Sequence, residues 1–202
     1  MAQATGSKLN IYTAERPCAG EEVSGDAWTM QQHGDVYRIS VIDGLGHGPI
    51  AHFAATTAVT ALEGSPDLPA LEALSMCHRA LHSTRGTAMS IAEVNMATGQ
   101  LVFCGIGNVE GIIWRAGEQN RLVPLRGIAG ANAPTLRAFN FDLGRDWMML
   151  LHSDGISSRV NVDNWKNGRS AAEKQSFVDG LLEEWGRDHD DVTVLIVCPD
   201  RA

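Results

Sequence analysis

Apolar and polar residues alternate along residues 36–42, which is the pattern of a β-strand with one buried face. The two faces differ in character, with Tyr37, Ile39 and Val41 on one and Arg38 and Ser40 on the other. The chain then enters residues 43–48, Asp-Gly-Leu-Gly-His-Gly, whose glycines predict a turn. We therefore expect a half-buried strand that ends at an acidic, glycine-rich loop.

Helical periodicity follows this loop. Pro49 suits the first turn of a helix, and Gly64-Ser65-Pro66 suits its end. Between them the apolar stripe consists of Ile50, Phe53, Ala54, Thr57, Ala58, Ala61 and Leu62. A second helix is expected from Asp67, as its N-cap, to about His82, with an apolar face of Leu68, Leu71, Leu74 and Leu81.

The middle of the chain favours strands. Short β-leaning runs separated by glycines predict an antiparallel meander over residues 87–94, 100–106, 110–115 and roughly 135–142. Residues 146–152 form a continuous apolar run, typical of a fully buried strand, and end at Ser153-Asp154-Gly155. A last helix is marked by Phe177, Val178, Leu181, Leu182 and Trp185, and residues 192–198 predict a final strand.

This order of elements predicts an α+β fold in which helices pack on sheets rather than between parallel strands. The 202 residues suffice for one sizeable core and are few for two. No repeat or linker divides the chain. We expect residues 9–202 to form a single domain and residues 1–8 to form a flexible N-terminal tail.

Charge and composition exclude several classes of protein. The net charge of -8 argues against a nucleic-acid binder, because phosphate backbones select basic surfaces. No apolar run approaches the roughly 18 residues of a membrane span, and no apolar signal region is present. We therefore expect a cytoplasmic protein with no membrane association. The four cysteines are widely spaced, which favours buried small side chains over a zinc site or disulfides.

Aspartates stand at the borders of several predicted strands. Asp43 and Asp154 each follow a buried strand and precede a glycine, while Asp26 and the pair Asp190-Asp191 precede strands. If these strand ends meet, the carboxylates would repel one another, and a hard divalent cation would relieve that repulsion. The alternative is that each aspartate is an ordinary turn or cap residue, since Asp-Gly is a common turn dipeptide.

A family resemblance rests on the order of these motifs. From about residue 20 to 198, the sequence resembles the bacterial PP2C-like (PPM) serine/threonine phosphatases of the SpoIIE branch. The residues that carry the resemblance are Ser24-Gly25-Asp26, Val41-Ile42-Asp43-Gly44-Leu45-Gly46-His47-Gly48, Gly86-Thr87-Ala88, Gly105-Ile106-Gly107-Asn108, Ser153-Asp154-Gly155 and Asp190-Asp191-Val192-Thr193-Val194.

The resemblance implies a four-layer α-β-β-α sandwich, with two central antiparallel sheets and two Mn²⁺ or Mg²⁺ ions at one end. It implies that Asp43 bridges the ions, that the Gly44 carbonyl completes one coordination shell, and that Asp26, Asp154 and Asp190 are the other protein ligands. Asp190 is preferred to Asp191 because the family's ligand is the first residue of that pair. Asp43 and Asp154 would act through a metal-bound water that attacks phosphorus in line.

The sequence departs from the larger family at one point. Eukaryotic members carry a phosphate-binding arginine near the first acidic motif, and the surroundings of Arg16 do not match that motif. A chain of this size resembles the small phosphatases of stress-response modules, which implies a phosphorylated antagonist or scaffold protein of a partner-switching system as substrate. The rival interpretations are a catalytically inactive PP2C-like binding domain and another two-metal hydrolase, such as a nuclease.

Other polar residues leave alternatives open. His47 reads as a residue that orders the loop or as one that contacts the site, and His152 as a structural histidine or a proton-transfer group. Ser153 is a poor candidate nucleophile, because no Gly-x-Ser-x-Gly elbow surrounds it. Gly107-Asn108 suits a plain hairpin turn as well as a turn near the ions.

Overall fold

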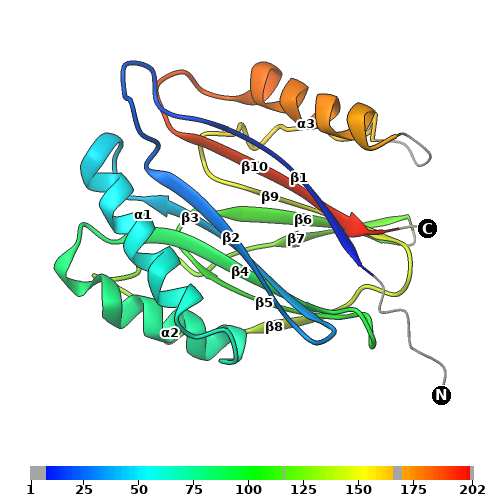
Figure 1. Ribbon diagram of the computed structural model, residues 1–202, viewed down its shortest axis with the longest axis horizontal. Coiled ribbons are helices and arrows are strands. Elements are labelled where there is room, and N and C mark those ends of the chain that lie inside the picture. The colour runs from blue at the N-terminus through cyan, green and yellow to red at the C-terminus, as the bar shows by residue number, and fades with distance from the viewer. Residues whose placement is uncertain (1–7, 116, 166–169, 201–202) are drawn as a thin grey trace.

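Two five-stranded antiparallel sheets pack face to face in the computed structural model, which describes residues 8–115, 117–165 and 170–200 (Figure 1). The first sheet has the order β1 (Leu9–Arg16), β10 (Val192–Pro199), β9 (Trp147–His152), β6 (Glu110–Arg115) and β7 (Glu118–Leu122). The second sheet has the order β2 (Asp26–His33), β3 (Val36–Gly44), β4 (Thr87–Asn95), β5 (Gln100–Ile106) and β8 (Phe139–Asp142).

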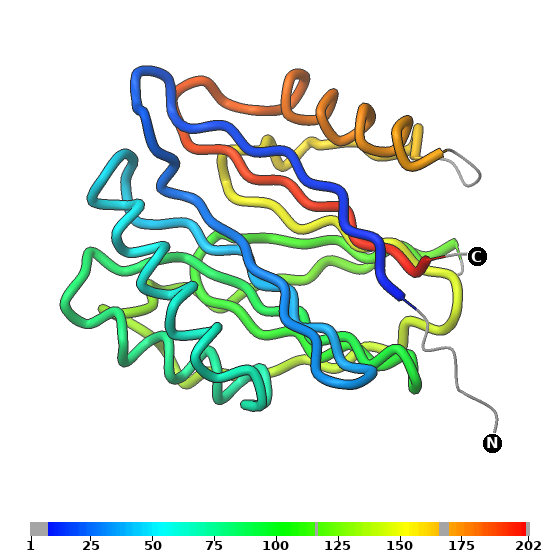
Figure 2. Tube along the Cα trace, viewed as in Figure 1, coloured from blue at the N-terminus to red at the C-terminus, as the bar shows by residue number. Residues whose placement is uncertain are grey.

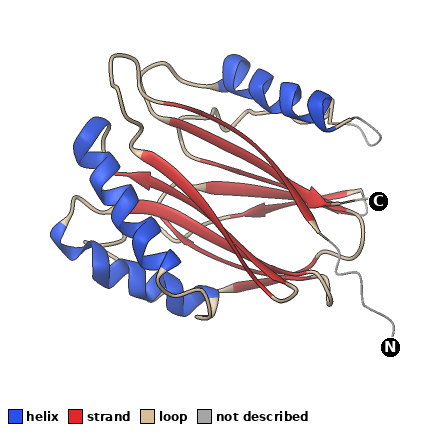
Figure 3. Ribbon diagram, in the orientation of Figure 1, coloured by secondary structure: helices blue, strands red, loops and turns tan. Residues whose placement is uncertain are grey.

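Helices cover the outer face of each sheet (Figure 3). Helices α1 (Gly48–Glu63) and α2 (Ala70–Ala80), with the short 3₁₀ turn η1 (Leu81–Ser83), lie on the second sheet, and α3 (Ala171–Trp185) lies on the first. One apolar cluster fills the space between the sheets, and one more lies under each helix layer. The expected α+β architecture, a four-layer α-β-β-α sandwich, is confirmed.

The two ends of the described chain meet in the first sheet. Strands β1 and β10 pair along their whole lengths, from Leu9 opposite Pro199 to Arg16 opposite Val192, and they run side by side in Figure 2. The predicted tail, residues 1–8, lies outside the described residues except for Lys8, whose carbonyl accepts a hydrogen bond from the Asp200 N–H at 2.6 Å. None of the described helices has both the length and the apolar character of a bilayer-crossing segment.

Strand β3 is buried on both faces, so the expectation of a half-buried strand is wrong. Arg38 is only 4% exposed and Ser40 is fully buried, although both lie on the face that the pattern marks as polar. The reason is that β3 lies between the other sheet and the helix layer, which cover opposite faces of it. Buried polar groups usually have hydrogen-bonding partners; Arg38 has several, whereas the Ser40 hydroxyl has none among the described residues.

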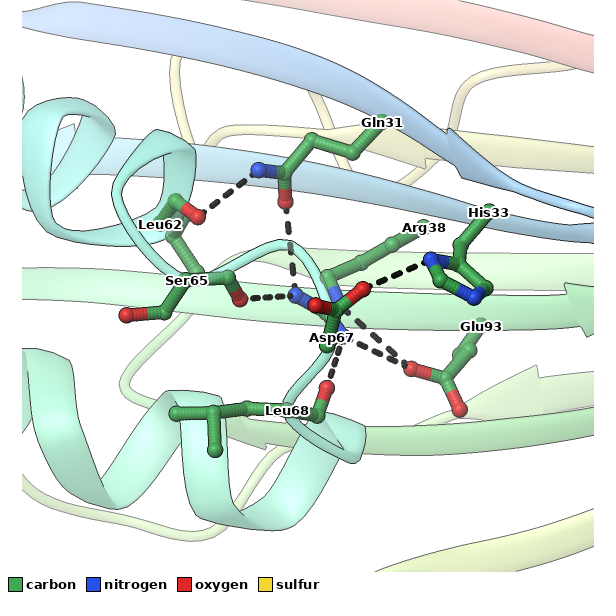
Figure 4. Close-up of polar contacts among 8 residues, drawn as sticks. All are labelled: Gln31, His33, Arg38, Leu62, Ser65, Asp67, Leu68 and Glu93. Atoms are coloured by element: carbon green, nitrogen blue, oxygen red, sulfur yellow. Dashed lines mark hydrogen bonds and ion pairs between the residues drawn. The ribbon is translucent and has the colours of Figure 1, made fainter.

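Arg38 finds its partners in the connection between α1 and α2 (Figure 4). Its guanidinium donates to the backbone carbonyls of Ser65 and Leu68, and pairs with Glu93 of the neighbouring strand at 3.2 Å. Gln31 accepts a further hydrogen bond from it. One buried cation therefore ties the linker between two helices to the sheet below.

The structure corrects the limits of several elements. Helix α2 begins at Ala70 with Pro69 as its N-cap, not at Asp67, because a proline disfavours helical geometry in the residue before it. Asp67 instead pairs with His33 at 2.6 Å. Strand β8 is shorter than the predicted run over 135–142, and strands β1 and β7 have no counterpart among the predicted elements.

The buried stripe of α1 also differs from the expected one. The residues that face the sheet are Gly48, Ala51, Ala54, Ala55, Ala58 and Leu62, whereas Ile50 and Phe53 are 54% and 60% exposed. The helix lies so close to β3 that a methyl group built on Gly44 would overlap the Ala51 carbonyl. Only small side chains fit at such a contact, so the larger apolar residues turn to solvent.

Candidate metal centre

Four strand ends carry the predicted aspartates to one end of the sandwich. Asp26 is the first residue of β2 and stands directly opposite Asp43, the last residue but one of β3. In the other sheet, Asp154 follows the end of β9 and Asp190 precedes the start of β10, and these two strands are antiparallel neighbours. Strand pairing therefore brings Asp26 next to Asp43 in one sheet and the ends that carry Asp154 and Asp190 together in the other.

The two pairs also meet each other across the sandwich. Burial raises the pKa of Asp43 to about 9, helped by the negative charges of Asp26, Asp154 and Asp190 and by a hydrogen bond with the Asp154 side chain. The pKa of Asp190 is raised by its partial burial and next by the charge of Asp154. The charges of Asp26, Asp154 and Asp190 thus all act on Asp43, and repulsion among these carboxyls disfavours their ionisation.

Asp26 is the most deeply buried member, with an exposed fraction of 5%. Burial raises its pKa to about 7, although contacts with the side chains of Ser153 and Thr193 act in the opposite direction. Its Oδ2 atom is buried and has no hydrogen-bonding partner among the described residues. A buried carboxylate oxygen without a donor suits contact with a cation or with a water that a cation holds.

Asp190 and Asp191 differ in their surroundings. Asp191 is 2% exposed, and its Oδ1 accepts a hydrogen bond from the Cys18 N–H at 2.9 Å. Asp190 is half-buried, and its Oδ1 accepts from the Asp191 N–H at 3.0 Å. One Asp191 oxygen therefore holds the connection between β1 and β2, while its Oδ2 is buried without a hydrogen-bonding partner among the described residues. Asp190 is the member of the pair whose pKa the Asp154 charge raises.

Glycine follows Asp43 and Asp154 because other chain segments approach closely there. A methyl group on Gly155 would overlap the Asp191 carbonyl, as one on Gly44 would overlap that of Ala51. The Gly44 N–H also donates to the Gly25 carbonyl at 2.9 Å. These contacts bring the loops that bear the aspartates against one another, so the glycines serve backbone packing within the site.

Asn108 is a residue of this site whose role the sequence left open. It lies in the turn that leaves β5 in one sheet and enters β6 in the other. Its Nδ2 donates to Asp154 Oδ2 at 2.6 Å. The turn therefore connects the two strands and also supports a site carboxylate. Its signal in the sequence is the Gly-Ile-Gly-Asn run of residues 105–108, which suited a plain hairpin turn as well as a turn near the ions.

Serine and histidine neighbours have structural partners. Ser153 is fully buried and its Oγ accepts from the Thr193 N–H at 3.0 Å, which agrees with its dismissal as a nucleophile. His152 is buried, burial lowers its pKa, and its Nδ1 lies 2.8 Å from the Ser153 carbonyl. His47 caps α1 and its Nδ1 lies 2.6 Å from Glu21 Oε1. These contacts agree with the structural alternative for both histidines.

The donor set fits a hard divalent cation. Every candidate ligand is an oxygen, which is the preference of Mg²⁺ and Mn²⁺. Among the described residues, no group of three or more His, Cys, Asp or Glu side chains is arranged closely enough to hold a metal ion as it stands.

Arg16 is committed elsewhere. Its Nη2 lies 3.1 Å from Asp188 Oδ1, in the connection between α3 and β10. The pair ties Arg16 to that connection, and Asp188 is itself largely exposed.

Comparison with known proteins adds family evidence to this geometry. Residues 33–200 match the family described as Stage II sporulation protein E (SpoIIE). Phosphoserine phosphatase RsbX of Bacillus subtilis (strain 168) is 23% identical over 155 residues, which cover 76% of this chain and 78% of RsbX.

Solved structures share the whole fold. A structure from work on the bacterial stressosome is 29% identical, covers 95% of this chain and all of its own, and has a TM-score of 0.88. RsbX in complex with magnesium is 19% identical, with 98% of each chain covered and a TM-score of 0.84. The catalytic domain of the serine/threonine phosphatase PstP, with two manganese ions, is 16% identical, covers 96% of this chain and 99% of its own, and has a TM-score of 0.67.

Proposed function

The chain belongs to the SpoIIE family of PP2C-like serine/threonine phosphatases, and on that premise we propose that it hydrolyses phosphoserine or phosphothreonine in a protein, using two divalent cations. The observation that carries the proposal is the raised pKa of Asp43, which burial and three neighbouring carboxylates bring to about 9. A carboxylate so placed is costly to ionise unless a cation binds beside it.

We assign the cations to Asp43, the Gly44 carbonyl, Asp154, Asp190 and Asp26. Support for Asp43 as the shared ligand is that its pKa responds to the other three aspartates. Support for Asp190 over Asp191 is the hydrogen bond that the Cys18 N–H donates to Asp191. Magnesium in one relative and two manganese ions in another agree with Mg²⁺ or Mn²⁺ as the cofactor.

We expect the cations and the protein side chains to have different roles in the reaction. Divalent cations, when bound, lower the pKa of a water ligand and neutralise charge on phosphoryl oxygens. The chain holds Asp154 in one orientation through Asn108 and keeps Asp26 in a buried position beside Asp43. Burial lowers the pKa of His152, which disfavours the charged form that a proton donor to the leaving group would need.

The substrate that we propose is a phosphorylated antagonist or scaffold protein of a bacterial partner-switching system. Support comes from the relative named phosphoserine phosphatase RsbX and from the fold shared with a stressosome structure. A cytoplasmic location is part of the same proposal. Cys18, Cys77, Cys104 and Cys198 are free buried thiols, as a reducing compartment favours.

The test is release of phosphate from p-nitrophenyl phosphate and from a phosphoserine protein. We expect turnover that requires Mn²⁺ or Mg²⁺, stops with EDTA, and is lost in Asp43→Asn while circular dichroism shows the same fold. Full turnover in EDTA, or normal turnover by Asp43→Asn, would contradict the proposal. No turnover by the wild type, together with tight binding of the phosphoprotein, would instead favour the inactive binding domain.

A further inference from the structure

Arg85 lies beside the loop that carries Asp43. The pairing of β3 with β4 ends with Gly44 opposite Thr87, and the Leu45 N–H donates to the Gly86 carbonyl at 3.0 Å. The next positions along the two chains are Gly46 and Arg85. The register of the second sheet therefore continues past the strands and sets Arg85 against the acidic loop.

The Arg85 guanidinium occupies the space that a side chain at position 46 would fill. A methyl group built on Gly46 would lie 3.1 Å from Arg85 Nη1. Gly46 also has a φ of +96°, a conformation that L side chains rarely adopt. The backbone conformation thus favours glycine here, three residues after the central carboxylate of the site, and the Arg85 guanidinium lies close beside it.

Arg85 carries an uncompensated positive charge at this end of the molecule. Its side chain is exposed, and none of the ion pairs among the described residues includes it. Arg16 and His47, which also lie near the acidic loops, have acidic partners in Asp188 and Glu21, whereas Arg85 has none among the ion pairs of the described residues. Arg85 is therefore free to bind an anion that reaches the aspartate cluster.

A phosphate monoester brings two negative charges to a site already built from four carboxylates. Two divalent cations balance the carboxylates and leave the substrate's own charge to be met. A guanidinium can donate two parallel hydrogen bonds to phosphate oxygens, which fixes the group's orientation as well as its charge. We propose that Arg85 binds the phosphate group of the substrate, an inference that rests on the proposed phosphatase function.

Calorimetric titration of inorganic phosphate into the Mn²⁺-saturated protein tests this without relying on turnover. We expect Arg85→Ala to weaken phosphate binding about tenfold or more, as loss of a charged hydrogen-bond donor does. Arg85→Lys keeps the charge and loses the planar guanidinium, so its phosphate affinity should lie between those of the wild type and Arg85→Ala. The matched control is Arg145→Ala, which lies before the start of β9 at the opposite end of the sandwich and should bind phosphate normally.

Kinetics separate phosphate binding from damage to the metal site. For Arg85→Ala we expect a higher KM for a phosphoserine peptide and weaker inhibition by phosphate, with an unchanged Mn²⁺ concentration for half-maximal activity. An active wild type with equal phosphate affinity in Arg85→Ala would overturn the inference alone. The inference would also be overturned if Arg126→Ala, in the loop that pairs with Gly107, lost phosphate affinity and Arg85→Ala did not. A wild type without turnover would overturn the proposed function instead.

Discussion

Asn108 Nδ2 lies 2.6 Å from Asp154 Oδ2, and this hydrogen bond joins the turn between the two sheets to the end of β9. It holds one carboxylate of the aspartate cluster in a single orientation. Loss of a group that orients a metal ligand in this way typically weakens metal binding by roughly 10- to 100-fold.

We predict that Asn108→Ala raises the Mn²⁺ concentration for half-maximal phosphatase activity by roughly 10- to 100-fold, because Asp154 loses the donor that orients it. Activity at saturating Mn²⁺ should fall less than that. Asn140→Ala, an exposed asparagine of β8, serves as the control and should leave the metal dependence unchanged. Equal metal dependence in both variants would show that the Asn108 contact has no influence on the site.

The metal-free protein should become less stable as pH rises through the neutral range. The folded-state pKa of Asp43 is about 9 against an ordinary value of 3.8, so the folded protein holds this proton more tightly than the unfolded chain. The resulting stabilisation is complete below the unfolded pKa and is lost as pH rises towards 9. The loss is at most about 1.4 kcal/mol per pH unit for one such group.

Urea unfolding in EDTA at several values between about pH 5.5 and pH 8.5 measures this effect. Saturating Mn²⁺ should abolish the decline, because the cation takes the place of the proton and binds better as pH rises. Asp43→Asn should flatten the metal-free profile. A metal-free wild type whose stability is constant or rises over this range would refute the assigned cluster.

Two glycine substitutions should have opposite effects on stability. Gly44→Ala forces a methyl group into the Ala51 carbonyl, so we expect a loss of about 1–3 kcal/mol in the free energy of unfolding. Gly180→Ala lies in α3 with nothing within 4 Å of the added methyl, and we expect a gain of up to about 1 kcal/mol from helix propensity. Thermal unfolding of both variants decides the matter, and a stable Gly44→Ala would mean that α1 can move away from β3.

Arg38 should matter for stability and not for chemistry. Arg38→Ala leaves the partly buried Glu93 without its partner and frees the carbonyls of Ser65 and Leu68, so we expect a loss of about 1–3 kcal/mol. Arg121→Ala, which breaks the exposed pair with Glu110, should cost less than about 1 kcal/mol. Urea midpoints measure the difference, and near-equal losses would contradict the importance assigned to the buried network.

The sequence by itself determined most of the fold. Buried strands such as residues 146–152 and the punctuation around α1 are local signals, because periodicity and turn chemistry act over a few residues. Strands β1 and β7 were not predicted, because edge strands of mixed polarity show no such pattern. The buried face of α1 was also predicted wrongly, because close packing on β3 favours alanine over Ile50 and Phe53.

Only the tertiary structure decided how the candidate site is arranged. Asp26 and Asp43 meet through strand register, and Asp154 and Asp190 join them because the two sheets pack face to face. Residue type alone could not separate Asp190 from Asp191; their different contacts arise from Cys18, which lies 173 positions from Asp191 in the chain. Convergence of distant residues is a property of strand pairing and packing, and local sequence patterns carry no record of it.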